Sequence, residues 1–298
     1  MLNEIVQHGG RVIIQGITGG YARSQAARML AYGTPVVAGV TPGRGGENLA
    51  GVPIFNTVQA AVDATGATVS VLYVPAPGVL EAAWEAMDAG IRLLVIPSEG
   101  VPVHDAMKLR ALARQRGCWI VGPNTAGIIW PGRLLLGSLA PDDAVPGPVA
   151  LISRSGTLSF EMVRLLSRAG LGQSFCVSVG GDRVVGRNPA EYLQVAADDP
   201  GTRAIVLIGE IGGTKEYEAA EVVQSLRGKK PVVAYVAGQS VPRGRTMGHV
   251  GAILETDRDT AEHKRAALAA AGAVVVNTPW EVPDALRAWA TGDRAEVK

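Results

Sequence analysis

Short apolar runs alternate with longer segments rich in alanine and leucine along the whole chain. The runs are rich in valine and isoleucine, as in buried parallel strands, and the longer segments have the length of crossover helices. This alternation predicts an α/β fold with mainly parallel sheets. In the first part of the chain we expect strands at residues 11–15, 35–40, 69–74, 93–97 and 119–121, and helices at 24–32, 58–64, 78–89 and 105–116.

A second series of runs follows a stretch at residues 131–148 that is rich in proline and turn-forming residues. Such a composition is typical of a linker. We therefore expect a nucleotide-binding-type domain at residues 1–130, a linker at 131–148 and a second α/β domain at 149–298. Its expected strands are 149–152, 174–179, 204–208, 232–236 and 274–276, and its expected helices are 157–169, 190–197, 217–226, 260–271 and 282–290.

Composition narrows the possible partners. The 28 basic and 27 acidic residues leave a net charge of +1, so no overall field draws the chain to nucleic acid or to an anionic membrane. No apolar run approaches the roughly 20 residues of a membrane span, and the first residues do not resemble a signal peptide. The two cysteines lie far apart with no histidine cluster, which argues against a disulfide framework or zinc site. We expect a cytoplasmic protein with no nucleic-acid partner, no membrane partner and no metal site.

Four loops of the first domain could converge on a phosphate-bearing ligand. The first expected strand runs into glycines at 16, 19 and 20, whose backbone N–H groups and following helix suit a phosphate. That spacing is neither GxGxxG nor a P-loop, so a tight turn is the alternative. Arg44 lies among small residues after the second strand, either as a phosphate ligand or in a solvated loop. Residues 73–77 and 96–100 follow the next two strands, and such carboxyl-end loops bind ligands in open α/β sheets.

One histidine of the second domain has the setting of a nucleophile. His249 is flanked by glycines at 248 and 251, which leave space for a substrate beside the imidazole. Glu210 ends a wholly apolar strand, where a carboxylate needs a partner such as that imidazole. The alternatives are a solvated loop histidine and a capping or surface glutamate.

An anion site is expected at residues 153–157, Ser-Arg-Ser-Gly-Thr, which follow a strand and open a helix. The free N–H groups and hydroxyls of such a helix start suit a phosphoryl group. An ordinary N-cap is the alternative. The second domain thus offers a nucleophile, an orienting carboxylate and an anion cradle.

Together these motifs resemble the α subunit of succinyl-CoA synthetase, also called succinate–CoA ligase. The resemblance covers nearly the full chain and keeps the family's order. The motifs are Gln-Gly-Ile-Thr-Gly at 15–19, Val-Thr-Pro-Gly-Arg-Gly-Gly at 40–46, Tyr-Val-Pro-Ala-Pro at 73–77, Gly-Pro-Asn at 122–124, Ser-Arg-Ser-Gly-Thr-Leu at 153–158, Ile-Gly-Glu-Ile-Gly-Gly at 208–213 and Met-Gly-His at 247–249.

The resemblance implies a Rossmann-like CoA-binding domain followed by a flavodoxin-like ligase domain. It also implies an ATP-grasp β subunit that binds Mg²⁺ and ATP or GTP, without which this chain is inactive. In the family, the triphosphate phosphorylates a histidine, the phosphoryl group passes to a small carboxylic acid, and CoA displaces phosphate from the acyl phosphate.

By the same resemblance, His249 is the phosphorylated histidine and Glu210 its orienting carboxylate. Ser155, Gly156 and Thr157 match the helix start that holds the phosphohistidine, and Asn124 and Phe160 fall where the acid binds. The positions matched to CoA binding are Thr18, Gly19, Gly20, Tyr21, Arg44, Tyr73, Val74, Pro75, Pro97, Ser98 and Glu99.

Departures from the family pattern bear on the substrate. Gly20-Tyr21-Ala22-Arg23 replaces Ser-Gln-Gly and a small residue, Arg44 replaces a lysine, and Pro97 lacks the N–H of its counterpart. Phe160 replaces a tyrosine, and losing a hydroxyl that contacts a substrate changes discrimination strongly.

Several other functions are alternatives to that of a succinate–CoA ligase subunit. Succinate is the default acid, with malate or citrate as alternatives within the superfamily. A non-catalytic CoA-binding protein is a further alternative, and the presence of both His249 and Glu210 counts against it. A nicotinamide-dependent oxidoreductase is disfavoured because GxGxxG is absent.

Overall fold

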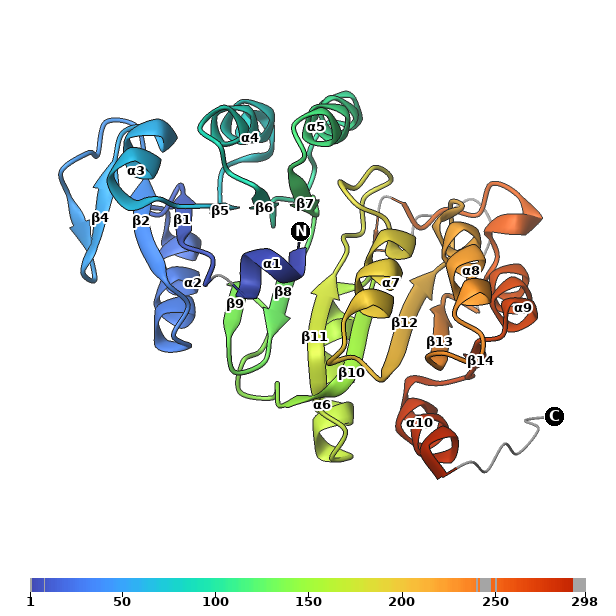
Figure 1. Cartoon of the computed structure of the whole chain (residues 1–298). Helices are drawn as coiled ribbons and strands as arrows, with labels where there is room; N and C mark the ends of the chain where they lie inside the picture. Colours follow the sequence, from blue (N-terminus) through green and yellow to red (C-terminus); the bar gives the residue numbers. More distant parts are fainter. Residues whose placement is uncertain (1, 8, 240, 242–247, 250, 292–298) are drawn as a thin grey trace. The chain divides into compact units, whose positions relative to one another are not determined.

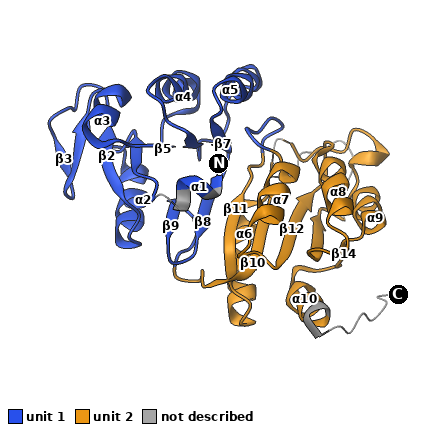
Figure 2. Ribbon diagram, in the orientation of Figure 1, with its two compact units in different colours: residues 1–141, 182–187 blue, residues 142–181, 188–298 orange. Residues whose placement is uncertain are grey.

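The chain folds into two α/β units in the computed structural model (Figure 1). Unit 1 comprises residues 1–141 and 182–187, and unit 2 comprises residues 142–181 and 188–298 (Figure 2). The structure describes residues 2–7, 9–239, 241, 248–249 and 251–291. The prediction of two mainly parallel α/β sheets is confirmed.

Unit 1 is built on a sheet whose strands run in the order β3-β4-β2-β1-β5-β6-β7. Apart from the antiparallel β3, the strands pair in parallel. Leaving β3 aside, this is the Rossmann order, which reverses between β1 and β5 and opens a crevice there. The elements are α1 (Leu2–Gln7), β1 (Val12–Gln15), α2 (Gly20–Ala31), β2 (Val36–Val40), β3 (Asn48–Leu49), β4 (Val52–Phe55), α3 (Val58–Thr65), β5 (Val69–Leu72), η1 (Ala76–Gly78), α4 (Val79–Asp88), β6 (Leu93–Val95), α5 (Val103–Gln115) and β7 (Trp119–Val121).

The central strands of this sheet are buried along their length because helices cover them. Every residue of β1, β5 and β6 is buried, as expected for parallel strands inside an α/β unit. Helices α3, α4 and α5 contribute alanines and leucines to the same core. This packing fixes the carboxyl ends of the strands, from which the loops of the candidate CoA site emerge.

The stretch at residues 131–148 differs from a continuous linker. It contains β9 (Leu134–Gly137), which pairs antiparallel with β8 (Gly127–Trp130), and the first residues of β10 (Pro146–Ser153). The Thr34 hydroxyl donates to the Leu135 carbonyl at 3.0 Å, which ties the hairpin to unit 1. The division between units falls after Pro141, and residues 182–187 return to unit 1.

In unit 2, neighbouring parallel strands follow the order β14-β13-β12-β10-β11. This is the flavodoxin-like order, whose switch point lies between the first and third strands of the unit, here β10 and β12. The elements are β10, α6 (Gly156–Arg168), β11 (Gln173–Ser178), α7 (Pro189–Asp198), β12 (Ala204–Glu210), α8 (Lys215–Ser225), β13 (Val232–Ala237), η2 (Asp257–Asp259), α9 (Ala261–Ala271), β14 (Val274–Val275), η3 (Pro279–Glu281) and α10 (Val282–Thr291).

Candidate active site

The candidate active site of unit 2 lies at the switch point of its sheet. Ser153 at the end of β10 pairs with Ile208 of β12, and the Arg154 amide donates to the Ile208 carbonyl at 3.0 Å. This register places the start of α6 and the end of β12 side by side. The two segments singled out from the sequence, 153–157 and 208–213, therefore leave the sheet as neighbours.

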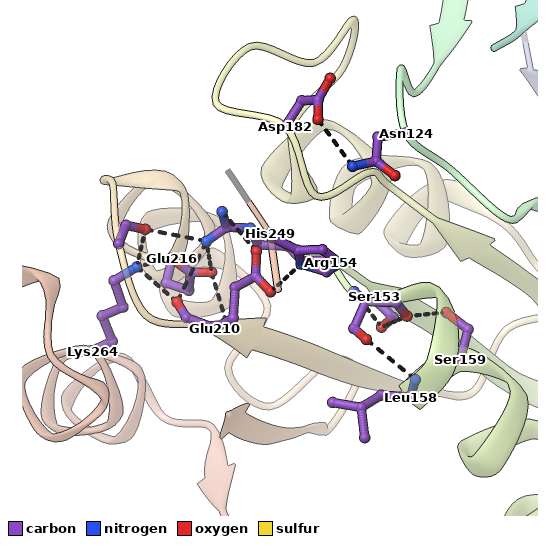
Figure 3. A network of polar contacts seen from close by, with 12 residues as sticks. Asn124, Ser153, Arg154, Leu158, Ser159, Asp182, Glu210, Glu216, His249 and Lys264 are labelled. Carbon is purple, nitrogen blue, oxygen red and sulfur yellow. Dashed lines mark hydrogen bonds and ion pairs between the residues drawn. The ribbon is translucent and has the colours of Figure 1, made fainter. Parts of the chain in front are cut away.

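His249 and Glu210 are in direct contact (Figure 3). The imidazole Nδ1 lies 2.7 Å from Glu210 Oε2. An ionised carboxylate can only accept, so Nδ1 carries a proton, and in the neutral imidazole the lone pair then lies on Nε2. The side chain of His249 is 27% exposed and that of Glu210 is 9% exposed, so a reactant can reach the imidazole from solvent while the carboxylate stays behind it.

Two glycines, Gly181 and Gly212, allow the backbone to approach His249 and Gly251 closely. A Cβ built on Gly181, just after β11, would lie 2.5 Å from Cγ and Cδ2 of the imidazole. Gly212 has a φ of +82°, and a Cβ there would lie 2.2 Å from the Gly251 carbonyl oxygen. Only glycine meets both requirements at position 212, a left-handed backbone and a close approach. Arg245, Thr246 and Met247 of the motif around His249 lie outside the described residues.

Behind Glu210 lies a buried cluster of three charged side chains (Figure 3). Arg154 Nη2 lies 3.0 Å from Glu210 Oε1, and Arg154 Nη1 donates to Glu216 Oε1 at 2.9 Å. The Lys264 ammonium pairs with Glu216 Oε2. The side chains of Arg154, Glu216 and Lys264 are 2%, 1% and 0% exposed, so they are shielded from solvent.

The charges of this cluster depend on one another. Burial would raise the pKa of Glu216, but Arg154 and Lys264 outweigh it and hold that pKa at about 2. Burial would lower the pKa of Arg154, yet Glu216 and Glu210 raise it. For Lys264 burial prevails, and its pKa is lowered although Glu216 opposes the shift. Each ion is tolerated inside the protein because its partners are also ionised.

The start of α6, where an anion site is predicted, is an N-capped helix terminus. Ser155 is the N-cap, and its hydroxyl accepts from the Leu158 amide at 3.3 Å. The Ser153 hydroxyl accepts from the Ser155 amide at 3.1 Å. Gly156 and Thr157 occupy the first helical positions, whose N–H groups have no partner within a helix and favour an anion.

The two residues expected at the acid-binding position lie in different units. Asn124 is in unit 1 with a left-handed φ of 55°, and its amide donates to Asp182 Oδ1 at 3.0 Å. Phe160 is half-buried in α6 of unit 2, one turn after Gly156. Their roles stay predictions.

In unit 1 the first and second loops of the predicted CoA site meet directly. The Gly16 amide donates to the Val40 carbonyl at 2.8 Å, and the Thr18 hydroxyl donates to the Thr41 hydroxyl at 3.3 Å. Gly16 has a φ of +74°, and a Cβ there would lie 2.3 Å from the Tyr73 carbonyl oxygen. A glycine is therefore required where the first loop touches the third.

The third and fourth loops are joined as well. The Ser98 hydroxyl donates to the Val74 carbonyl at 2.6 Å, and the backbone N–H of Asn124 donates to the Ser98 carbonyl at 2.9 Å. The four loops thus converge on the carboxyl ends of β1, β2, β5 and β6. The predicted positions on them are half-buried at Thr18, Tyr73, Val74, Pro97 and Ser98 and exposed at Gly19, Gly20, Tyr21, Arg44, Pro75 and Glu99.

Two aromatic rings from the first and third loops pack against each other. Tyr21 and Tyr73 pack edge to face, with ring centroids 5.6 Å apart. The Tyr73 hydroxyl is buried without a hydrogen-bond partner within the described structure, and burial raises the pKa of Tyr73. Arg44, by contrast, is exposed and forms a two-point ion pair with Glu47.

Sequence reasoning missed four residues of the unit 2 site: Arg154, Gly181, Glu216 and Lys264. Arg154 lies inside a recognised motif but had no role assigned. Gly181 follows a predicted strand, and that position is the signal that could have found it. Glu216 and Lys264 lie on amphipathic helices with many charges, where nothing local distinguishes them.

Neither a metal centre nor a membrane span is found where the structure is described. Among residues 2–7, 9–239, 241, 248–249 and 251–291, no three histidine, cysteine or acidic side chains gather as metal ligands would. Over the same residues, no helix combines the length and apolar character needed to cross a bilayer.

Comparison with known proteins matches both units to domain families. Residues 8–100 match the CoA binding domain family, and residues 152–274 match the CoA-ligase family. Fold, site and family matches together define a CoA ligase of the type that joins a CoA-binding domain to a ligase domain. More narrowly, the chain belongs to the family of succinate–CoA ligase α subunits.

The relatives behind that assignment span almost the whole chain. Succinate–CoA ligase (ADP-forming) subunit alpha 2 of Archaeoglobus fulgidus is 47% identical over 280 residues, covering 94% of this chain and 97% of the relative. The alpha subunit from Methanothermobacter thermautotrophicus is 45% identical, covering 93% and 94%. That of Staphylococcus aureus is 42% identical, covering 96% and 94%.

Solved structures agree on the fold. ATP citrate lyase from Methanothrix soehngenii, in complex with citrate and coenzyme A, superposes with a TM-score of 0.84 at 25% identity. The match covers 97% of this chain and 56% of that one, so this chain corresponds to about half of the lyase.

Proposed function

We propose that this chain is the CoA-binding, phosphohistidine-carrying subunit of an ADP-forming ligase that interconverts succinate, CoA and ATP with succinyl-CoA, ADP and phosphate. The observation that carries the proposal is the 2.7 Å contact between His249 Nδ1 and Glu210 Oε2 at the switch point of unit 2. The names and coverage of the relatives support the choice of succinate and ADP.

In the first step, His249 Nε2 is the nucleophile. Because Glu210 holds the proton on Nδ1, Nε2 has the lone pair that attacks the terminal phosphorus of ATP. The Nε2–P bond forms as the bond to the ADP oxygen breaks. A β subunit of the ATP-grasp type would hold ATP and Mg²⁺, and Glu210 stabilises the positive charge that develops on the imidazole.

The start of α6 would hold the phosphoryl group. The N–H groups of Gly156 and Thr157 and the side chain of Ser155 provide fixed dipoles at a helix N-terminus. Such dipoles stabilise an anion without having to reorganise as water does. The neighbouring ends of β10 and β12 support this assignment, because they bring the helix start beside Glu210.

In the second step, a carboxylate oxygen of succinate attacks the phosphorus, and the Nε2–P bond breaks. His249 then returns to its neutral state, and an acyl phosphate forms. In the third step, the sulfur of CoA attacks the acyl carbon, the bond from that carbon to the phosphate oxygen breaks, and inorganic phosphate leaves with the thiol proton as the thioester forms. The reaction balances with no redox change.

The unit 1 loops have properties suited to CoA. Their backbone approaches closely at Gly16, and the exposed Gly20 begins α2 after the N-cap Gly19, whose own N–H donates to the Gly16 carbonyl at 3.0 Å. The buried hydroxyl of Tyr73, which has no partner in the described part of the chain, lies in the same group of loops. A buried polar group without a partner costs free energy, which a ligand hydrogen bond would recover.

The test is phosphorylation of the intact complex. The chain is purified with its co-expressed β-type subunit and incubated with γ-labelled ATP and Mg²⁺. We expect acid-labile label on the chain, its loss in His249→Asn and its retention in His263→Asn, which changes an exposed histidine on α9. Succinate with CoA should discharge the label, whereas malate or citrate should not. A wild-type complex that stays unlabelled contradicts the proposal and favours a CoA-binding protein without this activity.

A further inference from the structure

The contacts of the buried cluster of Arg154, Glu216 and Lys264 converge on the short turn that carries Glu210. Arg154 Nη1 donates to the Glu210 and Gly212 carbonyl oxygens at 3.4 and 3.2 Å. Lys264 Nζ donates to the same two oxygens at 2.9 and 2.6 Å. Two cations from different elements therefore hold one turn of three residues.

Glu216 joins the two cations to that turn. Its Oε1 accepts from Arg154 Nη1 at 2.9 Å and from the Glu210 backbone N–H at 3.2 Å, and its Oε2 accepts from Lys264. A Cβ on Gly209 would lie 2.8 Å from the Glu216 side chain. The end of β12 is thus bound through its N–H and C=O groups on one side while its carboxylate faces His249 on the other.

Resting on the function proposed above, we propose that Lys264 and Glu216 are positioning residues for phosphoryl transfer: with Arg154 they fix the 210–212 turn so that Glu210 meets His249 Nδ1. The side chains of Lys264 and Glu216 are 0% and 1% exposed, so they act through Glu210 and not on the phosphoryl group. At metal sites, replacing the outer residues that orient a ligating side chain lowers metal affinity or activity about 10- to 100-fold, and we expect a loss of that order for residues that orient Glu210.

Stability alone does not account for this arrangement. Buried ion pairs often contribute little net stability, because removing the ions from water offsets their attraction. Arg154 and Lys264 balance Glu210 and Glu216, so the four charges sum to zero when all are ionised. This neutral set of ions holds the Glu210 carboxylate beside the imidazole, which needs an acceptor for its Nδ1 proton.

Changing the charge of cluster residues distinguishes an electrostatic effect on His249 from a loss of packing. Glu210 from β12 contacts the imidazole, and behind it lie Arg154, which follows β10, Glu216 from α8 and Lys264 from α9. Glu216→Gln leaves one excess positive charge and should lower the pKa of His249. Lys264→Met leaves one excess negative charge and should raise it. Loss of packing would move the two pH profiles in the same direction.

The experiment measures single-turnover phosphorylation of the full complex by Mg·ATP from pH 5 to 9. We expect at least a tenfold lower plateau rate for Lys264→Met, partial recovery in Lys264→Arg, and opposite shifts of the pH midpoint for Lys264→Met and Glu216→Gln. Lys230→Met is the matched control, because Lys230 also donates to two carbonyls of unit 2, those of Ala196 and Asp199. It should keep the wild-type rate and midpoint.

Each outcome decides between the explanations. Shifts in one direction, or wild-type rates in folded Lys264→Met and Glu216→Gln, overturn the positioning role while His249 labelling of the wild type still supports the proposed function. If Lys264→Met does not fold, the direction of the Glu216→Gln shift decides. If the wild-type complex is not labelled, the proposed function itself fails and this role fails with it.

Discussion

Gly181 lies against the imidazole of His249 so closely that a methyl group at residue 181 would stand 2.5 Å from two ring atoms. The φ angle of Gly181 is one that other residues also adopt, so it is the nearby imidazole ring of His249 that restricts this position to glycine. We predict that Gly181→Ala displaces the imidazole from Glu210 and lowers the rate of His249 phosphorylation by about 100-fold, because small misplacements of a reacting group can cost that much. Single-turnover labelling of the complex measures the effect.

The control for that change is Gly201→Ala. A Cβ at Gly201 would meet nothing nearer than the Asp199 carboxylate oxygens at 3.6 Å, an ordinary contact distance. This variant should be phosphorylated at the wild-type rate. Equal rates for both alanine variants would show that the imidazole position tolerates a neighbouring methyl group.

Glu210→Gln tests the tautomer of His249. A glutamine amide can donate to Nδ1, which would place the imidazole proton on Nε2 and remove the nucleophilic lone pair. We expect a loss of at least 100-fold in phosphorylation rate with little change in CoA affinity, since CoA is expected in unit 1. Glu221→Gln, an exposed position on α8, is the control. A Glu210→Gln enzyme within threefold of wild type would show that the carboxylate does not set the tautomer.

Tyr73→Phe tests whether CoA satisfies the buried hydroxyl. Removing a hydroxyl that has no hydrogen-bond partner among the described residues should leave the free energy of unfolding unchanged or slightly higher. If CoA bonds that hydroxyl, the Kd for CoA should rise about tenfold, the equivalent of roughly 1.4 kcal/mol. Calorimetric titration with CoA and chemical unfolding give the two quantities. An unchanged Kd would leave Tyr73 as a packing residue for Tyr21.

The elements with long apolar or alanine-rich signals were predictable from the sequence. The expected strand at 119–121 is β7, and the expected helix at 58–64 differs from α3 by one residue. Missed elements are short or contain breakers: β3 has two residues, and β4 contains Pro53. Helix α2 begins at Gly20, four residues before the expected start, because glycines at its first turn carry little helix propensity.

The site residues likewise divide into those with a local sequence signal and those without one. His249 and Glu210 were found because glycines and an apolar strand surround them, and the structure brings them together. Lys264 was missed because the Ala-Glu-His-Lys-Arg segment of α9 has the composition of a solvent-facing surface. Its burial arises because α9 packs against α8 and the end of β12, which lie far from α9 in the sequence, so no local pattern reveals it.

Arg44 and Glu47 give a pair of opposite predictions for CoA. The Arg44 guanidinium is engaged by the Glu47 carboxylate, which holds the pKa of Glu47 below its usual range through that hydrogen bond. If Arg44 binds a phosphate of CoA, Glu47 competes for it. Arg44→Met should then raise the Kd for CoA, and Glu47→Gln should lower it, with both effects weaker at high salt. Identical affinities for both variants would place the pair outside the binding surface.

Glu216 predicts how stability depends on pH. Its pKa is about 2 in the folded protein, against an ordinary value of 4.5. A carboxyl whose folded pKa is lowered stabilises the protein above the unfolded pKa, and that contribution is lost as the pH falls from about 5 toward 2. The difference corresponds to about 3 kcal/mol.

Urea unfolding of wild type and Glu216→Gln at several pH values isolates this contribution from that of other carboxylates. The stability gap between the two should be widest near pH 7 and should narrow steadily below pH 4.5. A gap that stays constant down to pH 3 would mean that the ionisation of Glu216 does not stabilise the fold and that its role in the cluster depends on shape alone.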